Sequence, residues 1–430
     1  MKKIYEKDWR YDFLHALAFP YIRGSFKKIQ FDGRENIPDD GAVIFAPNHC
    51  DALMDPFALL AMDLHQKVFV ARADLFQKPF LRKALTFIKI MPINRVRDGF
   101  RSVANTEDTI EKSIEVLNNQ VPFCILPEGM HRSMHSLLPL GKGIARIAVG
   151  ADKALAGNRP VYIVPVGCEY GDYYRLRSSL LVTVGKPIDI SAFIAAHPEH
   201  SEPMLYSDIR ALTAEAMKKL IVYIPDDDDY EATWELAKLS SGPVPETDLR
   251  GRLETNRRTA ERLGRLREED PGKARALFEK AIAYARARKS ARISSHATYT
   301  KRPLLAALWR TLKTLVCLPF FLAWAIASLP VWVLNETIAG KLKDRTFRNS
   351  FRCGIIIILW TILWLIGTIV LFCTMKWYWA LAGALLLAPA PLMTYAWFEQ
   401  VRRCASSWRY LFNPLVRKMK ERLTEDLKTI

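Results

Sequence analysis

The stretch that decides the fold is AVIFAPNHCDALMDP, residues 42–56. Its first five residues are apolar, which predicts a buried strand. His49 follows the strand, and Asp51 and Asp55 come next. An imidazole accepts a proton at neutral pH, and a carboxylate on its other ring nitrogen would fix its tautomer. The stretch therefore predicts a general base at a strand end. A helix starting here would put both carboxylates on one face, so the residues alone leave the partner of His49 open.

Short apolar runs alternate with helical patterns between residues 29 and 190. The predicted strands cover residues 29–32, 42–46, 67–71, 123–126, 161–166 and 180–184. The predicted helices between them cover residues 59–65, 81–87, 106–118 and 143–154. Strands that alternate with helices indicate an α/β layer fold.

Several basic residues fall near the ends of these strands. Residues 90–95 form a strand-like run that ends in Arg95. The block ILPEGMHRS, residues 125–133, contains Arg132, and Lys142 comes shortly after it. Because α/β folds bind their ligands at strand ends, fixed cations there would suit a phosphate.

Four blocks in a fixed order carry a resemblance to a known family. They are Asn48-His49 with a downstream Asp, a strand that ends in Arg95, the P-E-G block at 127–129, and a strand that contains Pro165. This order and spacing resembles the glycerolipid acyltransferase family, which includes glycerol-3-phosphate and lysophosphatidate acyltransferases. The flanks GRENIP, residues 33–38, and VGKP, residues 184–187, are also similar to the family. The resemblance covers roughly residues 25 to 195 and implies an α/β acyltransferase domain with a mixed sheet flanked by helices.

The resemblance implies a role for each block. His49 would deprotonate the acceptor hydroxyl, which attacks an acyl thioester of coenzyme A or acyl carrier protein, and Asp55 would orient His49. The residues implied around the acceptor are Asn48, Arg95, Glu128, Gly129, Arg132, Lys142 and Pro165, with Arg95 on the phosphate. The thioester is a co-substrate, and no cofactor or metal is implied. The absence of a G-x-S-x-G motif agrees with a mechanism that needs no acyl-enzyme.

Two departures from the common family pattern remain. Five residues separate His49 from Asp55, where the common spacing is four, and Met54 stands at the common position. The fungal glycerol-3-phosphate acyltransferases resemble this longer spacing, so we predict Asp55 and not Asp51. The block P-E-G-M-H-R-S is one residue longer than P-E-G-T-R-S, so the family's Arg corresponds to His131 or to Arg132, and Arg132 keeps the charge.

The chain changes character after residue 200. Helical patterns rich in Ala, Leu, Glu, Lys and Arg cover residues 207–223, 230–239, 247–266 and 271–288. A run of four Asp at 226–229 has no His or Cys beside it, so we expect a solvated loop that caps the next helix and not a metal site.

The composition and the charge-free runs predict a membrane protein. Lys and Arg number 62 against 45 Asp and Glu, a formal charge of +17, and the mean hydropathy is about zero. Three runs contain no charged residue: 314–334, 353–375 and 377–398. Only Lys376 separates the second run from the third, and each run is long enough to span a bilayer. We predict four segments: an amphipathic N-terminal helix (1–24), the acyltransferase domain (25–200), a helical region (201–300) and a membrane region with two or three transmembrane or re-entrant helices (301–430).

Basic residues flank the first charge-free run on both sides, which indicates that both flanks are cytoplasmic. Pro319 and Pro330 would interrupt a helix there. We therefore expect residues 314–334 to form a re-entrant or interfacial hairpin and the next two runs to form a spanning hairpin. Three full crossings is the rival arrangement. Either way, we expect a protein of the cytoplasmic membrane whose catalytic domain faces the cytoplasm, with basic segments that suit anionic headgroups.

The N-terminus and the cysteines indicate the cellular compartment of the protein. The first 30 residues are charged throughout, so we expect no secretory signal. Tyr5, Trp9, Phe13 and Leu17 share one helical face, which could lie in a membrane interface or pack on its own domain. Seven cysteines without a C-x-x-C motif fit a reducing compartment or structural thiols.

Together these features predict a membrane-bound O-acyltransferase of phospholipid synthesis, with membrane phospholipid and an acyl thioester as partners. Glycerol 3-phosphate and lysophosphatidate remain equal candidates as acceptor, and a lyso-aminolipid is a third. A non-catalytic lipid-binding protein on the same fold is the alternative from another class, against which the intact His49, Asp55, Arg95 and Glu128 argue. We expect no nucleic-acid binding, since the charge sits beside apolar runs.

Overall fold

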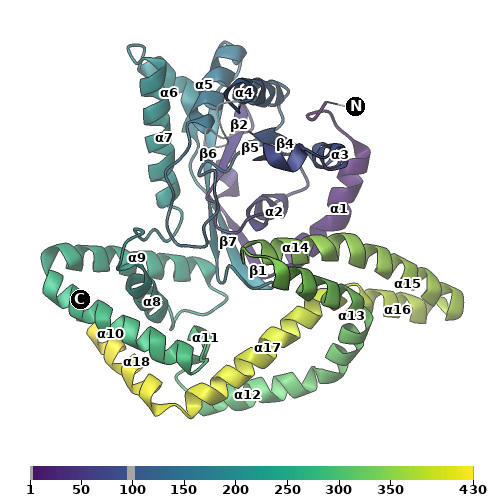
Figure 1. The fold of residues 1–430 in the computed structure, drawn as a ribbon, viewed down its shortest axis with the longest axis vertical. Coiled ribbons are helices and arrows are strands. Elements are labelled where there is room, and N and C mark those ends of the chain that lie inside the picture. The colour runs from purple at the N-terminus through teal and green to yellow at the C-terminus, as the bar shows by residue number, and fades with distance from the viewer. Residues whose placement is uncertain (1–2, 94–101, 430) are drawn as a thin grey trace. The chain divides into compact units, whose positions relative to one another are not determined.

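The computed structural model describes residues 3–93 and 102–429 of the chain (Figure 1). Contacts divide the chain into two compact units. Unit 1 comprises Met1–Arg23, Ile29–Tyr173 and Leu180–Ile221, and unit 2 comprises Gly24–Lys28, Tyr174–Ser179 and Val222–Ile430. The four segments expected from the sequence stay a prediction.

Unit 1 is built on a mixed sheet, which confirms the predicted α/β class. The strand order is β1-β7-β6-β2-β5-β3-β4, with β8 paired to β6. The strands are β1 (Phe26–Asp32), β2 (Ala42–Pro47), β3 (Val68–Arg72), β4 (Ile90–Ile93), β5 (Phe123–Cys124), β6 (Val161–Tyr170), β7 (Ser178–Val184) and β8 (Ile188–Asp189). The central strand β2 runs parallel to β5 and β6, whereas β7 and β8 run antiparallel to β6.

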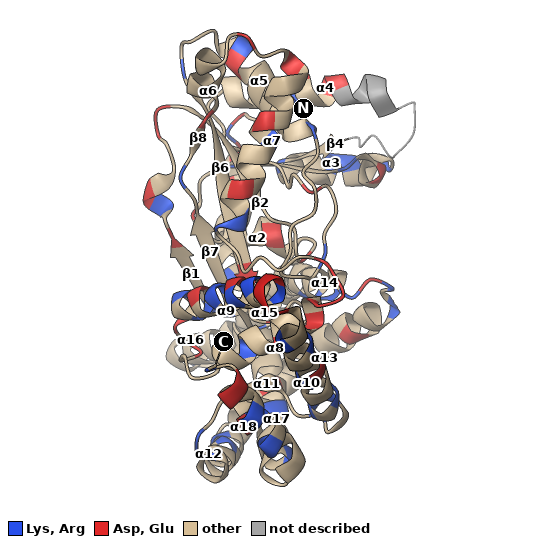
Figure 2. Cartoon of the chain, turned by 90° about the vertical axis from the view of Figure 1, so that its left-hand side faces the viewer, with Lys and Arg blue, Asp and Glu red and all other residues tan. Residues whose placement is uncertain are grey.

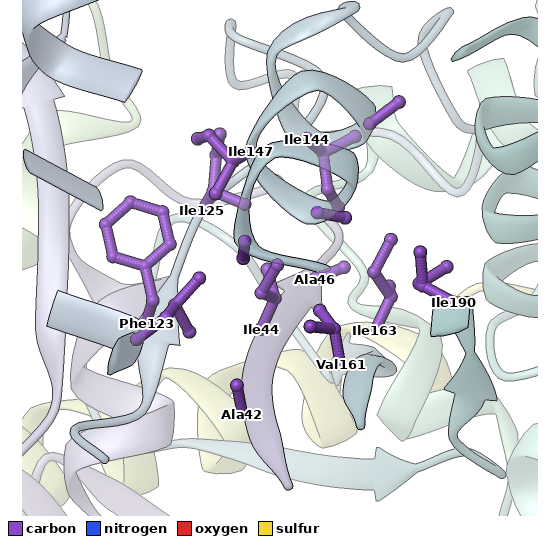
Figure 3. Packing of buried hydrophobic residues seen from close by; sticks show 14 of the residues in the cluster. Ala42, Ile44, Ala46, Phe123, Ile125, Ile144, Ile147, Val161, Ile163 and Ile190 are labelled. Atoms are coloured by element: carbon purple, nitrogen blue, oxygen red, sulfur yellow. The ribbon is translucent and has the colours of Figure 1, made fainter. Parts of the chain in front are cut away.

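Helices accompany the sheet, and α5 packs on its centre. They are α1 (Trp9–Gly24), α2 (Met54–Leu60), α3 (Pro79–Phe87), α4 (Ser102–Asn118), α5 (Gly143–Leu155), α6 (Ile190–Ala196) and α7 (Glu202–Lys218). Figure 3 shows Ile44 of β2 and Ile163 of β6 in one core with Ile144 and Ile147 of α5. All six residues of β2 are buried, as expected for a parallel strand covered on both faces. This packing fixes the strand end from which His49 follows.

The local predictions for unit 1 hold for the strands and for all but one of the helices. The helix predicted at 59–65 is wrong: α2 begins at Met54 and ends at Leu60. Pro56 lies in its first turn, where a proline is tolerated. Beyond the helix, residues 61–67 are not helical, and the Lys67 ammonium donates to Asp63 at 2.6 Å.

The aromatic face of the N-terminal helix is partly exposed. Trp9 and Phe13 are 74% and 65% exposed, and the residues of α1 that are buried include Tyr11 and His15 on another side. Tyr5, which precedes the helix, packs against the core of unit 1, and Leu17 is half-buried. The predicted face is therefore only partly exposed, and its insertion into a membrane interface stays a prediction.

Unit 2 contains a helical layer with its own core. Its helices are α8 (Tyr230–Ser240), α9 (Leu249–Glu269), α10 (Pro271–Ser290), α11 (Ser295–Thr298) and α18 (Pro414–Asp426). Leu236, Leu263 and Phe278 meet in this core, while α9 carries residues of both charges on its outside (Figure 2). The acidic run ahead of α8 is a loop, as expected, but Asp229 makes no side-chain cap hydrogen bond. Arg267 holds Asp227 and Asp229 instead.

The remaining helices of unit 2 include the candidate membrane spans. They are α12 (Pro303–Val316), α13 (Leu318–Lys341), α14 (Phe347–Ile355), the π-helical segment η4 (Ile356–Trp360), α15 (Thr361–Thr374), α16 (Trp377–Leu387) and α17 (Ala390–Leu411). Among the described residues, Leu318–Lys341 and Phe347–Thr374 are each long and apolar enough to cross a membrane. Ile362, Ile366 and Ile369 are more than half exposed. Such large aliphatic side chains on a charge-free helix suit contact with lipid.

The first apolar run is interrupted at one of the two expected prolines. Helix α12 ends at Val316 and α13 begins at Leu318 with Pro319 in its first turn, but the 24-residue helix α13 continues through Pro330. A proline removes one backbone hydrogen bond, and apolar helices accommodate it by small local adjustments. The bent element is the third run, in which α16 and α17 meet at 49° and form either a broken span or a re-entrant loop.

Candidate active site

His49 and Asp55 lie together at the end of the central strand of unit 1. The strand β2 ends at Pro47, the chain turns through His49, and α2 starts at Met54 with Asp55 in its first turn. This turn brings Nδ1 of His49 within 2.8 Å of Oδ2 of Asp55. His49 keeps part of its ring exposed, whereas Asp55 is fully buried.

Asp55 accepts hydrogen bonds at both carboxylate oxygens. Oδ2 also accepts from the backbone N–H groups of Cys50 and Asp51 at 2.8 and 2.9 Å. Oδ1 accepts from the Tyr170 hydroxyl at 2.7 Å. An ionised carboxylate can only accept, so Nδ1 of His49 is the protonated ring nitrogen. Nε2 then carries the lone pair, which is the form that a general base needs.

The geometry separates the two carboxylates that the sequence left open. Asp55, not Asp51, lies within hydrogen-bond distance of the His49 ring. Asp51 is buried as well, and its backbone N–H supports the Asp55 carboxylate.

Tyr170 is the residue of this site that sequence reasoning missed. It lies at the end of β6 and is buried. Burial raises the pKa of its hydroxyl well above the ordinary value, and the Asp55 charge acts in the same direction. Tyr170 therefore remains a proton donor to Asp55. Its place at the end of a strand next to β2 was the signal that could have found it, but no motif marks it.

Glu128 joins the P-E-G loop to the histidine loop. Its two carboxylate oxygens accept from the backbone N–H groups of His49 at 2.7 Å and Leu138 at 2.8 Å. Burial raises the pKa of Glu128 to about 7, although these two hydrogen bonds and His49 act in the opposite direction. Gly129 follows with φ of +67°, a conformation that favours glycine. Both residues shape the loop beside His49.

The longer block after Gly129 brings the His131 ring and the Arg132 backbone to His49. The ring of His131 lies edge-on to the ring of His49, with centroids 5.4 Å apart. The backbone N–H of Arg132 donates to the His49 carbonyl at 3.0 Å, and its guanidinium donates to Ser136. The extra residue therefore puts His131 against the base and Arg132 one step further along the loop.

The other predicted binding residues are placed less directly. Asn48 is buried, and its side-chain amide bonds the backbone of Cys168 on β6 at 2.6 and 3.2 Å, so it ties two strands together. Pro165 is buried within β6 opposite Ala46. Lys142 is exposed at the start of α5. Arg95 lies outside the described residues.

These features define a class of protein: an α/β protein in which a buried carboxylate is hydrogen-bonded to a histidine ring at the end of a parallel strand. A comparison with protein families is more specific. Residues 28–169 match the family described as Acyltransferase, and this range contains His49, Asp55, Glu128 and Pro165. This part of the chain is therefore similar to the acyltransferase family, the resemblance that its sequence predicted.

Further comparisons add little to this assignment. Among solved structures, the 1-acyl-sn-glycerophosphate (LPA) acyltransferase PlsC from Thermotoga maritima is 21% identical. The match covers 49% of this chain and 78% of that chain, with a TM-score of 0.34. A TM-score this low carries no argument about substrate. Among curated proteins, no sequence matches.

Proposed function

We propose that this protein transfers a fatty acyl chain from an acyl thioester to a hydroxyl of glycerol 3-phosphate or 1-acylglycerol 3-phosphate. The observation that supports this most is the 2.8 Å hydrogen bond between His49 Nδ1 and Asp55, which leaves Nε2 to act as a base. The family match of residues 28–169 supports acyl transfer as the reaction class.

The proposed step uses only the residues of the site. Nε2 of His49 takes the proton of the acceptor hydroxyl as the oxygen attacks the thioester carbonyl carbon. A new C–O bond forms, the C–S bond breaks, and the imidazolium returns its proton to the departing thiolate. Asp55 stabilises the imidazolium while it exists and keeps the ring in place. The acyl donor is an acyl-CoA or an acyl carrier protein, and no further cofactor takes part.

The acceptor is proposed from the charges near the base. Both candidate acceptors carry a phosphate monoester, which arginine binds well. We assign the phosphate to Arg95, following the family resemblance, with Arg132 and Lys142 as further cations of the pocket. Glu128 and Gly129 would form its wall. A lyso-aminolipid is the alternative acceptor, and it would place less demand on these cations.

A cytoplasmic-membrane location goes with this reaction. The two candidate spans, or three with the bent pair, support membrane association. We propose that the acyltransferase domain faces the cytoplasm, where acyl thioesters are found.

The test offers the purified full chain a labelled acyl thioester with glycerol 3-phosphate and lysophosphatidate in parallel reactions. We expect a labelled ester from at least one acceptor, and the acceptor that yields product decides between the two activities. No ester from either acceptor, with acyl-CoA and acyl carrier protein both tried, would contradict the proposal. A lyso-aminolipid in a third reaction then tests the alternative acceptor.

A further inference from the structure

Unit 2 contains a cavity of about 510 Å³ that is rich in arginine. Its walls come from the segment 174–176, the end of α13, the residues around α14, and the middle of α17. Five guanidinium groups and two carboxylates line it: Arg175, Arg345, Arg348, Arg352 and Arg402 with Glu336 and Glu399. The cavity therefore carries an excess of positive charge.

The two carboxylates are already taken by neighbours. Glu336 accepts two hydrogen bonds from Arg352, at 2.9 and 2.8 Å, and a third from the Tyr395 hydroxyl at 2.8 Å. Glu399 accepts from Arg403 at 3.0 Å and from Arg175 at 3.1 Å. Arg402 also lies 4.0 Å from Glu399, so three of the five arginines face a carboxylate.

Arg345 and Arg348 are the arginines of the cavity that do not pair with either of its carboxylates. Among the described residues, neither has a carboxylate within 4.0 Å. Nε of Arg348 is buried and has no hydrogen-bond partner there. Arg345 lies over the ring of Tyr174, with its guanidinium carbon 4.8 Å from the centroid, so an aromatic face orients it. A buried guanidinium N–H without a partner is costly, and an anion in the cavity would remove that cost.

The other wall of the cavity is aromatic. Trp332 and Phe398 stack with centroids 5.7 Å apart, and both line the same space as the arginines. The site thus offers cations for an anionic group and apolar rings for the part of the ligand attached to it. Such a division is typical of sites for amphiphiles.

The cavity lies where two candidate spans approach each other along the chain. Glu336 is near the end of Leu318–Lys341, and Arg348 and Arg352 are near the start of Phe347–Thr374. Residues 342–346 join them and reach at most about 17 Å, too short to cross a hydrocarbon core of about 30 Å. If both helices span, the cavity lies at the level of the headgroups.

We propose that this cavity binds the phosphate headgroup of an anionic membrane phospholipid. Arg345 and Arg348 bind the phosphate oxygens, while Trp332 and Phe398 contact the glycerol and the first carbons of the chains. A phosphate on a soluble molecule, such as coenzyme A, shares this chemistry. The lipid is favoured because the cavity adjoins the ends of two apolar helices with exposed aliphatic side chains.

The test titrates the full chain in neutral detergent with phosphatidylglycerol and with phosphatidylcholine, and measures bound lipid by native mass spectrometry. The variant Arg345→Gln/Arg348→Gln removes the two cations and leaves the Arg352–Glu336 pair in place. A matched variant, Arg258→Gln/Arg275→Gln, removes two exposed arginines of α9 and α10. Thermal unfolding shows whether each variant is folded, and Arg345→Gln alone serves if the double variant is not.

We expect the wild type and the matched variant to prefer phosphatidylglycerol, and the cavity variant to bind it about tenfold or more weakly, since each charged hydrogen bond is lost. Binding of phosphatidylglycerol by the cavity variant at wild-type affinity would overturn the proposal. So would equal affinity of the wild type for the two lipids. Coenzyme A or inorganic phosphate is added as competitor, and binding of these that depends on the two arginines without any binding of phosphatidylglycerol would assign the cavity to a soluble phosphate instead.

Discussion

At the scale of single residues, the account depends on which carboxylate holds His49. Asp55 accepts from the ring at 2.8 Å and from two backbone N–H groups. An Asn at 55 would present an amide N–H₂ to donors or to Nδ1, which disturbs the loop and favours the wrong tautomer. We expect Asp55→Asn to lower kcat by about a hundredfold or more. Asp51→Asn should cost much less, so equal losses in steady-state kinetics would refute the assignment.

Tyr170 allows a milder test of the same network. Tyr170→Phe removes the hydroxyl that donates to Oδ1 of Asp55 at 2.7 Å and changes little else. A buried acceptor without its donor costs about 1–3 kcal/mol, so we expect kcat to fall by about tenfold while KM for the thioester stays the same. A variant with wild-type kcat would show that Tyr170 is not needed to position Asp55.

Glu128 predicts a pH dependence of stability. Its pKa is raised from the ordinary 4.5 to about 7 by burial, so between these values the folded state holds a proton that the unfolded state has released. Stability from this group is full below pH 4.5 and is lost as pH rises through about 7, by roughly 3 kcal/mol in all. The variant Glu128→Gln cannot titrate at this position. Measured by thermal unfolding, it should therefore lose less stability than the wild type between pH 5 and 8. Parallel pH curves for the two proteins would contradict this.

The sequence showed part of this site and missed part. His49, Asp55 and Glu128 were found because they stand in short motifs at strand ends. Tyr170 was missed because its contact depends on the register of β6 against β2, a pairing between residues far apart in the chain. Asn48 was expected near substrate, yet its amide is used to join the same two strands. A motif indicates a residue's importance but not the direction of its side chain.

At the scale of elements, the strands were easier to predict than the helix boundaries. The apolar run of β2 marks a buried strand by itself, because both of its faces are covered. Helix α2 begins at Met54 with Pro56 in its first turn and ends at Leu60, boundaries that the apolar periodicity of residues 59–65 did not indicate. Likewise Pro330 was expected to break α13, but an apolar helix carries it without interruption.

A buried ion pair joins two helices of the helical layer of unit 2, and its contribution to stability can be tested. Arg288 of α10 reaches Glu235 of α8 at 2.9 and 3.0 Å, and both side chains are almost fully buried. Glu235 also accepts from Lys238 at 2.6 Å. Removing Glu235 therefore leaves two cations without their carboxylate, and the loss of a buried ion-pair partner costs about 3–5 kcal/mol. We expect Glu235→Ala to reduce the hydrogen-exchange protection of α8 and α10 accordingly.

The control for that experiment is Glu279→Ala, which removes an exposed pair with Arg275 on α10. Exposed pairs contribute less than about 1 kcal/mol, so protection should hardly change. Similar effects of the two substitutions would show that the buried pair has no special part in joining the helices.

At the scale of the whole molecule, the mean hydropathy of zero averages two unlike parts. One consists of the α/β domain and the charged helices such as α9, and the other is a set of apolar helices with exposed aliphatic side chains. The charge-free runs could be predicted from composition, because a bilayer demands length and apolarity. The number of membrane crossings could not be predicted. Basic residues on both sides of α13 indicate that both of its ends are cytoplasmic, whereas its length is sufficient for a full crossing.

Topology is therefore open to a direct test. We predict from the charge bias that residues 337–350 face the cytoplasm. Single cysteines placed there should resist a membrane-impermeant thiol reagent in intact cells and react after permeabilisation. Labelling in intact cells would place this segment outside and would favour three full crossings.

The most direct test of the central claim compares acyl transfer by the wild type and by His49→Ala, using a labelled acyl thioester and the acceptor that the wild type uses. A control variant, His65→Ala, removes a ring that is 89% exposed in its side chain. The account predicts that His49→Ala folds, as its thermal unfolding would show, and loses about 100- to 10,000-fold or more of the transfer rate, while His65→Ala keeps it. Transfer by His49→Ala at the wild-type rate would contradict the account.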